Sequence, residues 1–124
     1  MPAPVECAYA AGFFDGEGSV SICYGSSLPT IRVSVAQNDL EPLERIKKEF
    51  GGEIYPAVRG NNHLEWNKAE EVIFFLESIL PYSSRRKDKV NLAIEIAKLI
   101  GKKDLGSKVL RLRLVEKFEE VHVA

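Results

Sequence analysis

Polar and apolar residues alternate along four short stretches of the chain, and this period of two predicts strands. The first two stretches cover residues 19–24 and 30–35, joined by a turn at 25–29 that contains glycine, serine and proline. The second two cover residues 53–59 and 62–67, on either side of Gly60 and Asn61. Each pair therefore predicts a hairpin.

Helical composition and spacing predict five helices around these hairpins. They are expected at residues 8–14, 38–50 (capped by Asn38 or Asp39 and closed by Gly51 and Gly52), 69–80 (ending before Pro81), 85–100 and 104–121. The order α-β-β-α-β-β-α-α-α predicts the α+β class, with one four-stranded antiparallel sheet that carries its helices on one face. The 124 residues, of which 45% are hydrophobic, are expected to form a single domain, 1–124, around one core.

The sheet face that turns away from the helices is expected to be polar. The apolar phase of the strands holds Val20, Ile22, Ile31, Val33, Val35, Ile54, Val58, Leu64 and Trp66. The polar phase holds Ser19, Ser21, Cys23, Thr30, Arg32, Ser34, Tyr55, Arg59, His63, Glu65 and Asn67. Such a face is usually just solvated. Four polar strands side by side also suit a curved surface that lies in the major groove of DNA.

Composition excludes some classes of protein. No run of ~18 apolar residues is present, and no basic segment leads into a long apolar stretch, so neither a membrane span nor a signal peptide is expected. Cys7 and Cys23 lack metal-ligand spacing and are expected to be free thiols in a reducing, intracellular compartment, whether cytoplasm, nucleoid or organelle.

The net charge of −1 conceals an asymmetry along the chain. Residues 85–113 include ten basic and three acidic residues, a net charge of +7, whereas the remaining residues sum to −8. This distribution favours a basic face that binds an acidic partner. Amphipathic surface helices alone also produce such a distribution.

Residues 10–18, with the sequence AAGFFDGEG, carry the most distinctive chemistry. Two glycines flank a single carboxylate, Glu17, between a helical segment and a strand. Glycine permits the backbone that ends a helix abruptly, and the last turn of a helix leaves carbonyl oxygens without partners. A carboxylate beside such carbonyls offers a hard cation several oxygen ligands. An acid beside a helix-ending glycine is also common in ordinary solvated turns.

This nonapeptide resembles the signature of the LAGLIDADG homing endonucleases. It agrees at the alanine, the first glycine, both acidic positions and the last glycine, while Ala10 replaces the leading leucine and Glu17 the second aspartate. Residues 35–43 resemble the segment with a glutamine near the family's active site, which assigns that role to Gln37, on the apolar phase of its strand. Residues 80–92 resemble a later segment with a basic residue near the scissile phosphate, which assigns that role to Arg86, with Lys87 as the alternative.

The resemblance implies a fold, a cofactor and an activity. The family has an α-β-β-α-β-β-α core and binds DNA through its sheet, so the polar phase becomes the expected DNA-binding surface. Glu17 and the carbonyl of Gly16 are expected to hold Mg²⁺ or another divalent cation. The implied function is a site-specific endonuclease that cuts both strands of a long, nearly palindromic DNA site across the minor groove, consistent with intron or intein mobility.

The chain has a single copy of the motif and no internal repeat, and the resemblance then implies a homodimer, since family members with one copy act as homodimers. Ala8, Gly12 and Gly16 recur every four residues, and such a small-residue face lets two helices approach closely. We expect Ala8, Ala11, Gly12 and Asp15 at the interface, with the two Glu17 side chains meeting at the two-fold axis. A soluble helix can also press such a face against its own core.

Two other functions fit the sequence. One is a catalytically silent DNA- or RNA-binding relative, such as a maturase that assists intron splicing, and only this alternative includes an RNA partner. The other is a generic α+β ligand-binding or interaction module.

Overall fold

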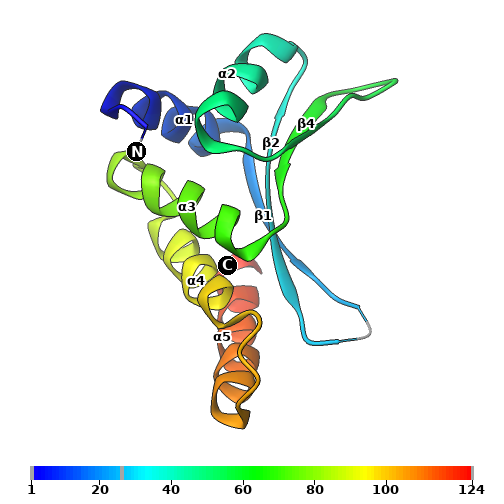
Figure 1. The fold of residues 1–124 in the computed structure, drawn as a ribbon, viewed down its shortest axis with the longest axis vertical. Coiled ribbons are helices and arrows are strands. Elements are labelled where there is room, and N and C mark those ends of the chain that lie inside the picture. The colour runs from blue at the N-terminus through cyan, green and yellow to red at the C-terminus, as the bar shows by residue number, and fades with distance from the viewer. Residues whose placement is uncertain (1, 26, 124) are drawn as a thin grey trace.

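The computed structural model describes residues 2–25 and 27–123, with the backbone alone at 122 and 123, so Ser26 in the expected turn lies outside the described residues. In chain order the elements are α1 (Pro4–Glu17), β1 (Gly18–Cys23), β2 (Thr30–Gln37), α2 (Leu40–Phe50), β3 (Glu53–Tyr55), β4 (Asn62–Trp66), α3 (Ala69–Ile79), the short 3₁₀ helix η1 (Leu80–Tyr82), α4 (Lys87–Leu99) and α5 (Leu105–Val123) (Figure 1). None of the described helices is both long and apolar enough to cross a membrane.

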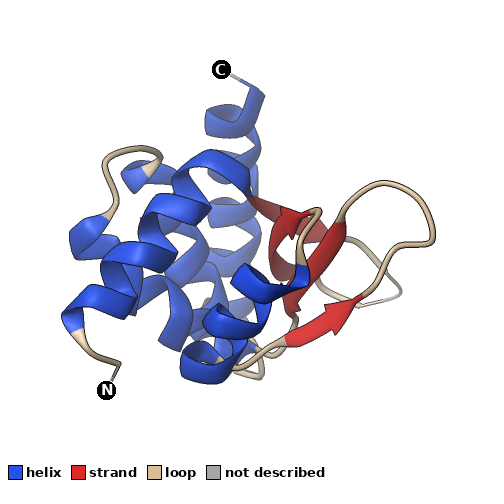
Figure 2. Ribbon diagram, turned by 90° about the horizontal axis from the view of Figure 1, so that it is seen from above, coloured by secondary structure: helices blue, strands red, loops and turns tan. Residues whose placement is uncertain are grey.

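The four strands form one antiparallel sheet in the order β1-β2-β4-β3. Figure 2 shows the helices gathered on one side of this sheet, which leaves the other face open. The predicted α+β class, the order of elements and the placement of the helices on one face are therefore confirmed.

The second hairpin is shorter than the sequence pattern predicts. β3 ends at Tyr55, because the following Pro56 has no N–H to donate to a ladder. The backbone N–H of Ala57 instead bonds the side-chain oxygen of Asn62 at 3.0 Å. Val58, expected to face the helices, is fully exposed in the resulting loop, so that prediction is wrong.

The core forms where the apolar phase of the sheet meets the helices. Trp66 stacks on Phe75 of α3 with ring centroids 3.9 Å apart and planes inclined by 10°. Phe14 of α1 and Phe50 of α2 meet the same Phe75 ring edge-on. The indole N–H of Trp66 donates to the carbonyl of Phe50 at 3.1 Å, so its only polar atom is satisfied inside the core.

The motif helix α1 ends differently from the expected glycine stop. It continues through Gly16 to Glu17, and Gly18 is extended, with φ −84° and ψ 157°, as the first residue of β1. Glycine is required at position 18 by space: a Cβ there would lie 2.3 Å from the ring of the fully buried Phe14 and 2.5 Å from its carbonyl oxygen. Close packing therefore ends the helix and turns the chain into the sheet.

The start of α2 also differs in detail from the prediction. Asp39 occupies the N-cap position, but its side chain makes no capping hydrogen bond. At the other end, Gly51 and Gly52 adopt positive φ, as expected of glycines that close a helix.

Helix α5 is fastened to the turn between β1 and β2 by a buried arginine. The Arg111 guanidinium is only 6% exposed and donates to the carbonyl of Pro29 at 2.9 Å and to that of Leu28 at 3.3 Å. Arg111 therefore does not contribute to the basic face that the charge distribution favoured. Lys98, from the same basic region, is paired with Glu77 at 3.1 Å.

Candidate active site

Glu17 and Gln37 share a shallow hollow at the end of α1, with Gly16 in its wall. Glu17 is the last residue of the helix, and its carboxylate is exposed. Gln37 ends β2 and belongs to the phase that faces the helices. That phase directs the side chain toward α1, so no bulge in the strand is needed to bring it to Glu17.

The Gln37 amide is oriented by the backbone next to it. Its oxygen accepts a hydrogen bond from the N–H of Asn38 at 2.8 Å. The amide NH₂ then remains as the donor that can bind an oxygen of a ligand or of water.

The carboxylate of Asp15, two residues before Glu17, forms hydrogen bonds within its own chain. Its carboxylate accepts hydrogen bonds from the Ser83 hydroxyl at 2.6 Å, from the Ser84 N–H at 2.9 Å and from the Ser84 hydroxyl at 3.1 Å. Burial alone would raise its pKa, but these bonds hold the pKa of Asp15 below its ordinary value. Asp15 thus joins α1 to the segment that precedes α4, and its place at a dimer interface stays a prediction.

Arg86 stands at the N-cap of α4 in an unusual backbone conformation. Its φ of 60° lies in the left-handed region, where a residue with a Cβ is disfavoured by roughly 1 kcal/mol or more. Its guanidinium donates to the carbonyl oxygen of Gly18, the residue directly after Glu17. The end of α1 and the start of α4 are therefore connected twice, through Asp15 and through Arg86.

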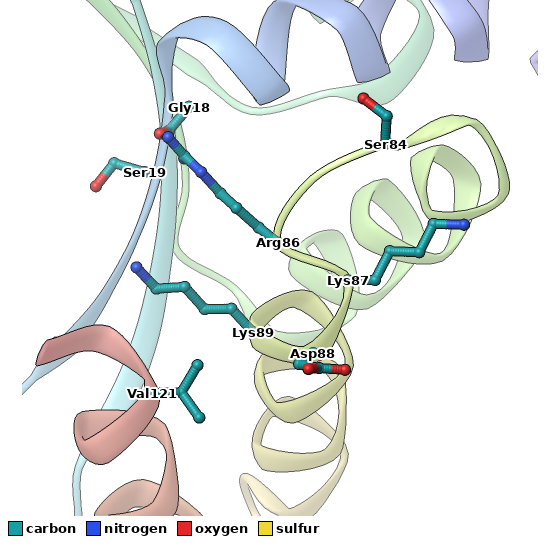
Figure 3. Close-up of a pocket in the computed structure, with 8 residues that line it drawn as sticks. All are labelled: Gly18, Ser19, Ser84, Arg86, Lys87, Asp88, Lys89 and Val121. Atoms are coloured by element: carbon teal, nitrogen blue, oxygen red, sulfur yellow. The ribbon is translucent and has the colours of Figure 1, made fainter. Parts of the chain in front are cut away.

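A second hollow surrounds Arg86 and contains a lysine that the sequence analysis missed. Figure 3 shows Arg86 and Lys89 both extending toward the start of β1, where Gly18 and Ser19 lie. Lys87, the expected alternative to Arg86, directs its ammonium away from them (Figure 3). The spacing of three residues between Arg86 and Lys89 puts both on one side of a helix start, and this is the sequence feature that could have identified Lys89.

The oxygen donors at the end of α1 fit a divalent cation that also binds substrate. Among the described residues, no group of three or more histidine, cysteine, aspartate or glutamate side chains is placed to hold a metal. The chain offers the side chain of Glu17 and the backbone carbonyl of Gly16, and both residues are exposed. Mg²⁺ is commonly bound by one or two carboxylates together with water and substrate phosphates, and this donor set suits that mode.

Residues 10–96 match the family model described as LAGLIDADG endonuclease. The chain belongs to the LAGLIDADG endonuclease family. This membership sets aside the generic ligand-binding or interaction module that the sequence had left open.

Curated and solved relatives agree with the family assignment. The chain is 32% identical over 74 residues to the intron-encoded RNA maturase bI4 of Saccharomyces cerevisiae, a match that covers 55% of this chain and spans only 12% of that protein. Two structures of the homing endonuclease I-CvuI in complex with DNA are similar to this chain at 24% identity. The structure in 2 mM Mg has a TM-score of 0.77 and covers 93% of this chain and 80% of the I-CvuI chain. The structure in 2 mM Ca has a TM-score of 0.78 and covers 94% of this chain and 81% of the I-CvuI chain. The archaeal intron-encoded homing endonuclease I-Vdi141I, in complex with DNA, has a TM-score of 0.79 at 20% identity, covering 94% of this chain and 83% of its own.

The open face of this LAGLIDADG sheet carries the polar phase of the strands. Residues opposite one another in an antiparallel pair project to the same face. The pairs on the open face include Ser19 with Ser34, Ser21 with Arg32, Cys23 with Thr30, Ser34 with Glu65, and Tyr55 with His63. None of the eleven residues of the polar phase is buried. Asn67 directly follows β4, whereas Arg59 lies in the loop between β3 and β4, so its predicted place on a strand is wrong. Glu53, opposite Glu65, is a further member of this face that the sequence analysis did not include.

The small-residue face of the motif helix is exposed, with one exception. Ala8, Gly12 and Gly16 are exposed, and no atom lies within 4 Å of a Cβ built at Gly12 or Gly16. Ala11 is 0% exposed because it packs into the core of its own chain, so its assignment to the interface is wrong. The open stripe consists of Ala8, Gly12 and Gly16.

Proposed function

We propose that this LAGLIDADG family member is a site-specific DNA endonuclease that acts as a homodimer, with residues 1–124 forming one catalytic domain per subunit. The observation that carries the proposal is that Glu17 and Gln37 share one hollow at the end of α1, while Arg86 bonds the carbonyl of the next residue, Gly18, beside an open polar sheet. The similarity to I-CvuI and I-Vdi141I, homing endonucleases whose structures are complexes with DNA, supports double-stranded DNA as the substrate. Such a substrate implies action wherever the host element's DNA lies, in the nucleoid or cytoplasm or in an organelle.

The proposed chemistry is hydrolysis of a phosphodiester in each strand. Mg²⁺ or another divalent cation, held by Glu17 and the Gly16 carbonyl, would supply an acidified water and charge stabilisation at the phosphate. The Gln37 NH₂ is suited to orient a water or a phosphate oxygen, since its own oxygen is bonded to Asn38. Arg86 would offset negative charge that develops on the phosphate, since its bond to the Gly18 carbonyl holds its guanidinium at the start of β1, directly after Glu17 in the chain.

We infer a homodimer because a single chain carries only one candidate cleavage site among its described residues. A cut in both strands needs two sites, and each chain supplies one Glu17. The exposed stripe of Ala8, Gly12 and Gly16 is suited to close contact between two copies of α1. A two-fold axis along this contact would bring both Glu17 side chains near the minor groove and extend the two sheets along a nearly palindromic site.

A silent DNA- or RNA-binding relative is the second candidate, supported only by the name of the yeast relative. That match leaves most of the maturase uncovered. The exposed Glu17 and its neighbours favour the nuclease, since a silent binder has no need of an acid at this point.

Selection by cleavage tests the proposal. A library of duplexes with a long randomised region is incubated with the protein in Mg²⁺, and the cut ends are sequenced. The nuclease predicts enrichment of one nearly palindromic family of sites, cut in both strands with short 3′ overhangs, and no cutting when EDTA replaces Mg²⁺. Binding without any cleavage, or binding to structured RNA in preference to duplex DNA, would support the silent relative instead.

A further inference from the structure

The hollow at the start of α4 holds two converging cations. Its wall includes Arg86, Lys89 and Ser19, so it connects the end of α1 with the open sheet face. Figure 3 shows the Lys89 ammonium on the same side as the Arg86 guanidinium and the Ser19 hydroxyl, whereas the Asp88 carboxylate points elsewhere. This side of the hollow therefore has the character of an anion site.

Lys89 is held in this position by packing against α5. Its ammonium lies 5.5 Å from the centre of the Phe118 ring, and Phe118 is 1% exposed, so the lysine head group has a fixed aromatic ring beside it. Glu119 is the acidic residue whose charge acts on Lys89. Its carboxylate accepts a hydrogen bond from the Tyr24 hydroxyl at 3.3 Å. A lysine that is ordered before binding loses less entropy when it contacts a ligand.

Lys89 and Arg86 bring two positive charges close together in this hollow. Burial first, and then the neighbouring Arg86, lower the pKa of Lys89 below its ordinary value, while Glu119 opposes them. Two cations beside the positive end of the α4 dipole repel each other. A phosphate placed between them would relieve this repulsion and bond both.

We propose that Lys89 is a second phosphate-binding residue of the cleavage site, which contacts a phosphodiester of the DNA backbone beside Arg86. The inference rests on the proposed endonuclease function and adds to it a residue outside the motif. Arg86 is tied to Gly18, whereas Lys89 reaches the hollow from one helical turn further along α4. The two cations can therefore bind different oxygens of one phosphate or two successive phosphates.

The test measures DNA binding and cleavage separately for Lys89→Met, Lys89→Arg and the control Lys98→Met. Lys98 lies on the same helix and is exposed. It is not among the described residues that line the hollow. Binding to a short non-specific duplex is measured over a range of salt concentrations with Ca²⁺, and cleavage of the selected site is measured in single turnover with Mg²⁺. Inorganic phosphate is added as a competitor to distinguish a backbone site from a site for free phosphate.

Lys89→Met is expected to reduce the slope of log affinity against log salt by about one per subunit. It is expected to slow cleavage by about tenfold or more at saturating protein. Lys89→Arg should keep most of both properties, Lys98→Met should match the wild type, and millimolar phosphate should not displace the duplex. If Lys89→Met does not fold, as judged by circular dichroism, Lys89→Gln is measured in its place.

Two results separate failure of this inference from failure of the proposed function. If the wild type cuts DNA and Lys89→Met equals Lys98→Met in slope and rate, Lys89 does not bind phosphate, and the endonuclease proposal stands. If the wild type neither binds duplex DNA in a salt-dependent manner nor cuts it, both proposals are overturned. A loss confined to binding of structured RNA, or displacement by inorganic phosphate, also contradicts the assignment of Lys89 to the DNA backbone.

Discussion

Asp15 and Glu17 are both acids of the motif, yet they have opposite surroundings. Residues two apart on a helix are separated by roughly 200° around its axis. Asp15 therefore turns toward Ser83 and Ser84 of its own chain, while Glu17 remains exposed at the helix end. The sequence motif predicts that both acids are functional. Only the fold shows that Asp15 connects α1 to the segment before α4, whereas Glu17 is free of such bonds among the described residues, in position to hold a cation.

Replacing Asp15 with Asn should destabilise the protein in a pH-dependent way. The pKa of Asp15 is lowered in the folded state from its ordinary value of 3.8, so its stabilising effect is present above that pH and is lost as pH falls through the lower folded value. At neutral pH, Asp15→Asn is expected to lower the free energy of unfolding by about 1 kcal/mol. The effect is no larger because Asp15 is only half-buried, so water screens the hydrogen bonds of its carboxylate. Urea unfolding at neutral pH and below pH ~3.5 measures the difference. A difference that stays constant over this range would contradict the assigned bonds.

Replacing Gly18 with Ala should destabilise the folded protein, because the added methyl group has no room. The new Cβ would lie 2.3 Å from the ring of Phe14, which is fully buried and cannot move aside. Overpacking of this kind is expected to cost about 1–3 kcal/mol. Gly106→Ala is the matched control, since a Cβ there meets its nearest atom at an ordinary 3.5 Å. Thermal unfolding that shows Gly18→Ala as stable as Gly106→Ala would contradict the close approach.

At the scale of elements, the sequence predicts periodic segments well and long-range contacts poorly. The strands of the first hairpin follow from strict alternation and are confirmed nearly to the residue. β3 is overpredicted because the pattern of alternation extends past Pro56, which ends the ladder. Arg111 is counted as a surface charge because its partners, the carbonyls of Leu28 and Pro29, lie more than 80 positions away in the sequence.

The open sheet face makes a prediction about base preference. Arg32 is exposed on β2 opposite Ser21, on the face proposed to contact DNA. Arg32→Ala is expected to relax the preference at particular base pairs by about 1–3 kcal/mol, the discrimination that one arginine–guanine contact provides. Repeating the library selection with this variant gives the comparison. Weakening that is uniform across all sequences would instead identify Arg32 as a phosphate contact.

At the scale of the whole molecule, the candidate site is assembled from parts far apart in the chain. The family resemblance predicts Glu17, Gln37 and Arg86 together. In the structure the strand phase brings Gln37 into the same hollow as Glu17, and Arg86 bonds the carbonyl of Gly18, the residue after Glu17. Lys89 was missed because it is one of several cations in a basic segment, and its partner Phe118 comes from α5. The burial of Ala11 was missed because helical spacing alone does not tell which side of α1 faces its own core.

Assembly is tested by Gly12→Leu. A large side chain on the open stripe is expected to separate two α1 helices that depend on close backbone contact. Within one chain the position is open, with no atom within 4 Å of a Cβ, so the variant should still fold. Sedimentation velocity should therefore show a folded monomer, while Gly106→Leu, at the start of α5, remains dimeric. A dimer that persists in Gly12→Leu at the wild-type concentration dependence would place the interface elsewhere.

The central claim is that Glu17 makes this chain a metal-dependent DNA endonuclease, and one paired measurement tests it most directly. Glu17→Gln removes the anionic oxygen while keeping the size of the side chain, and Glu116→Gln makes the same change on the exposed side of α5. Cleavage of the selected site in Mg²⁺ and its binding in Ca²⁺ are measured for both variants and the wild type. We predict that Glu17→Gln loses cleavage by about 10²-fold or more while binding is retained, and that Glu116→Gln matches the wild type. Cleavage by Glu17→Gln at the wild-type rate would contradict the claim.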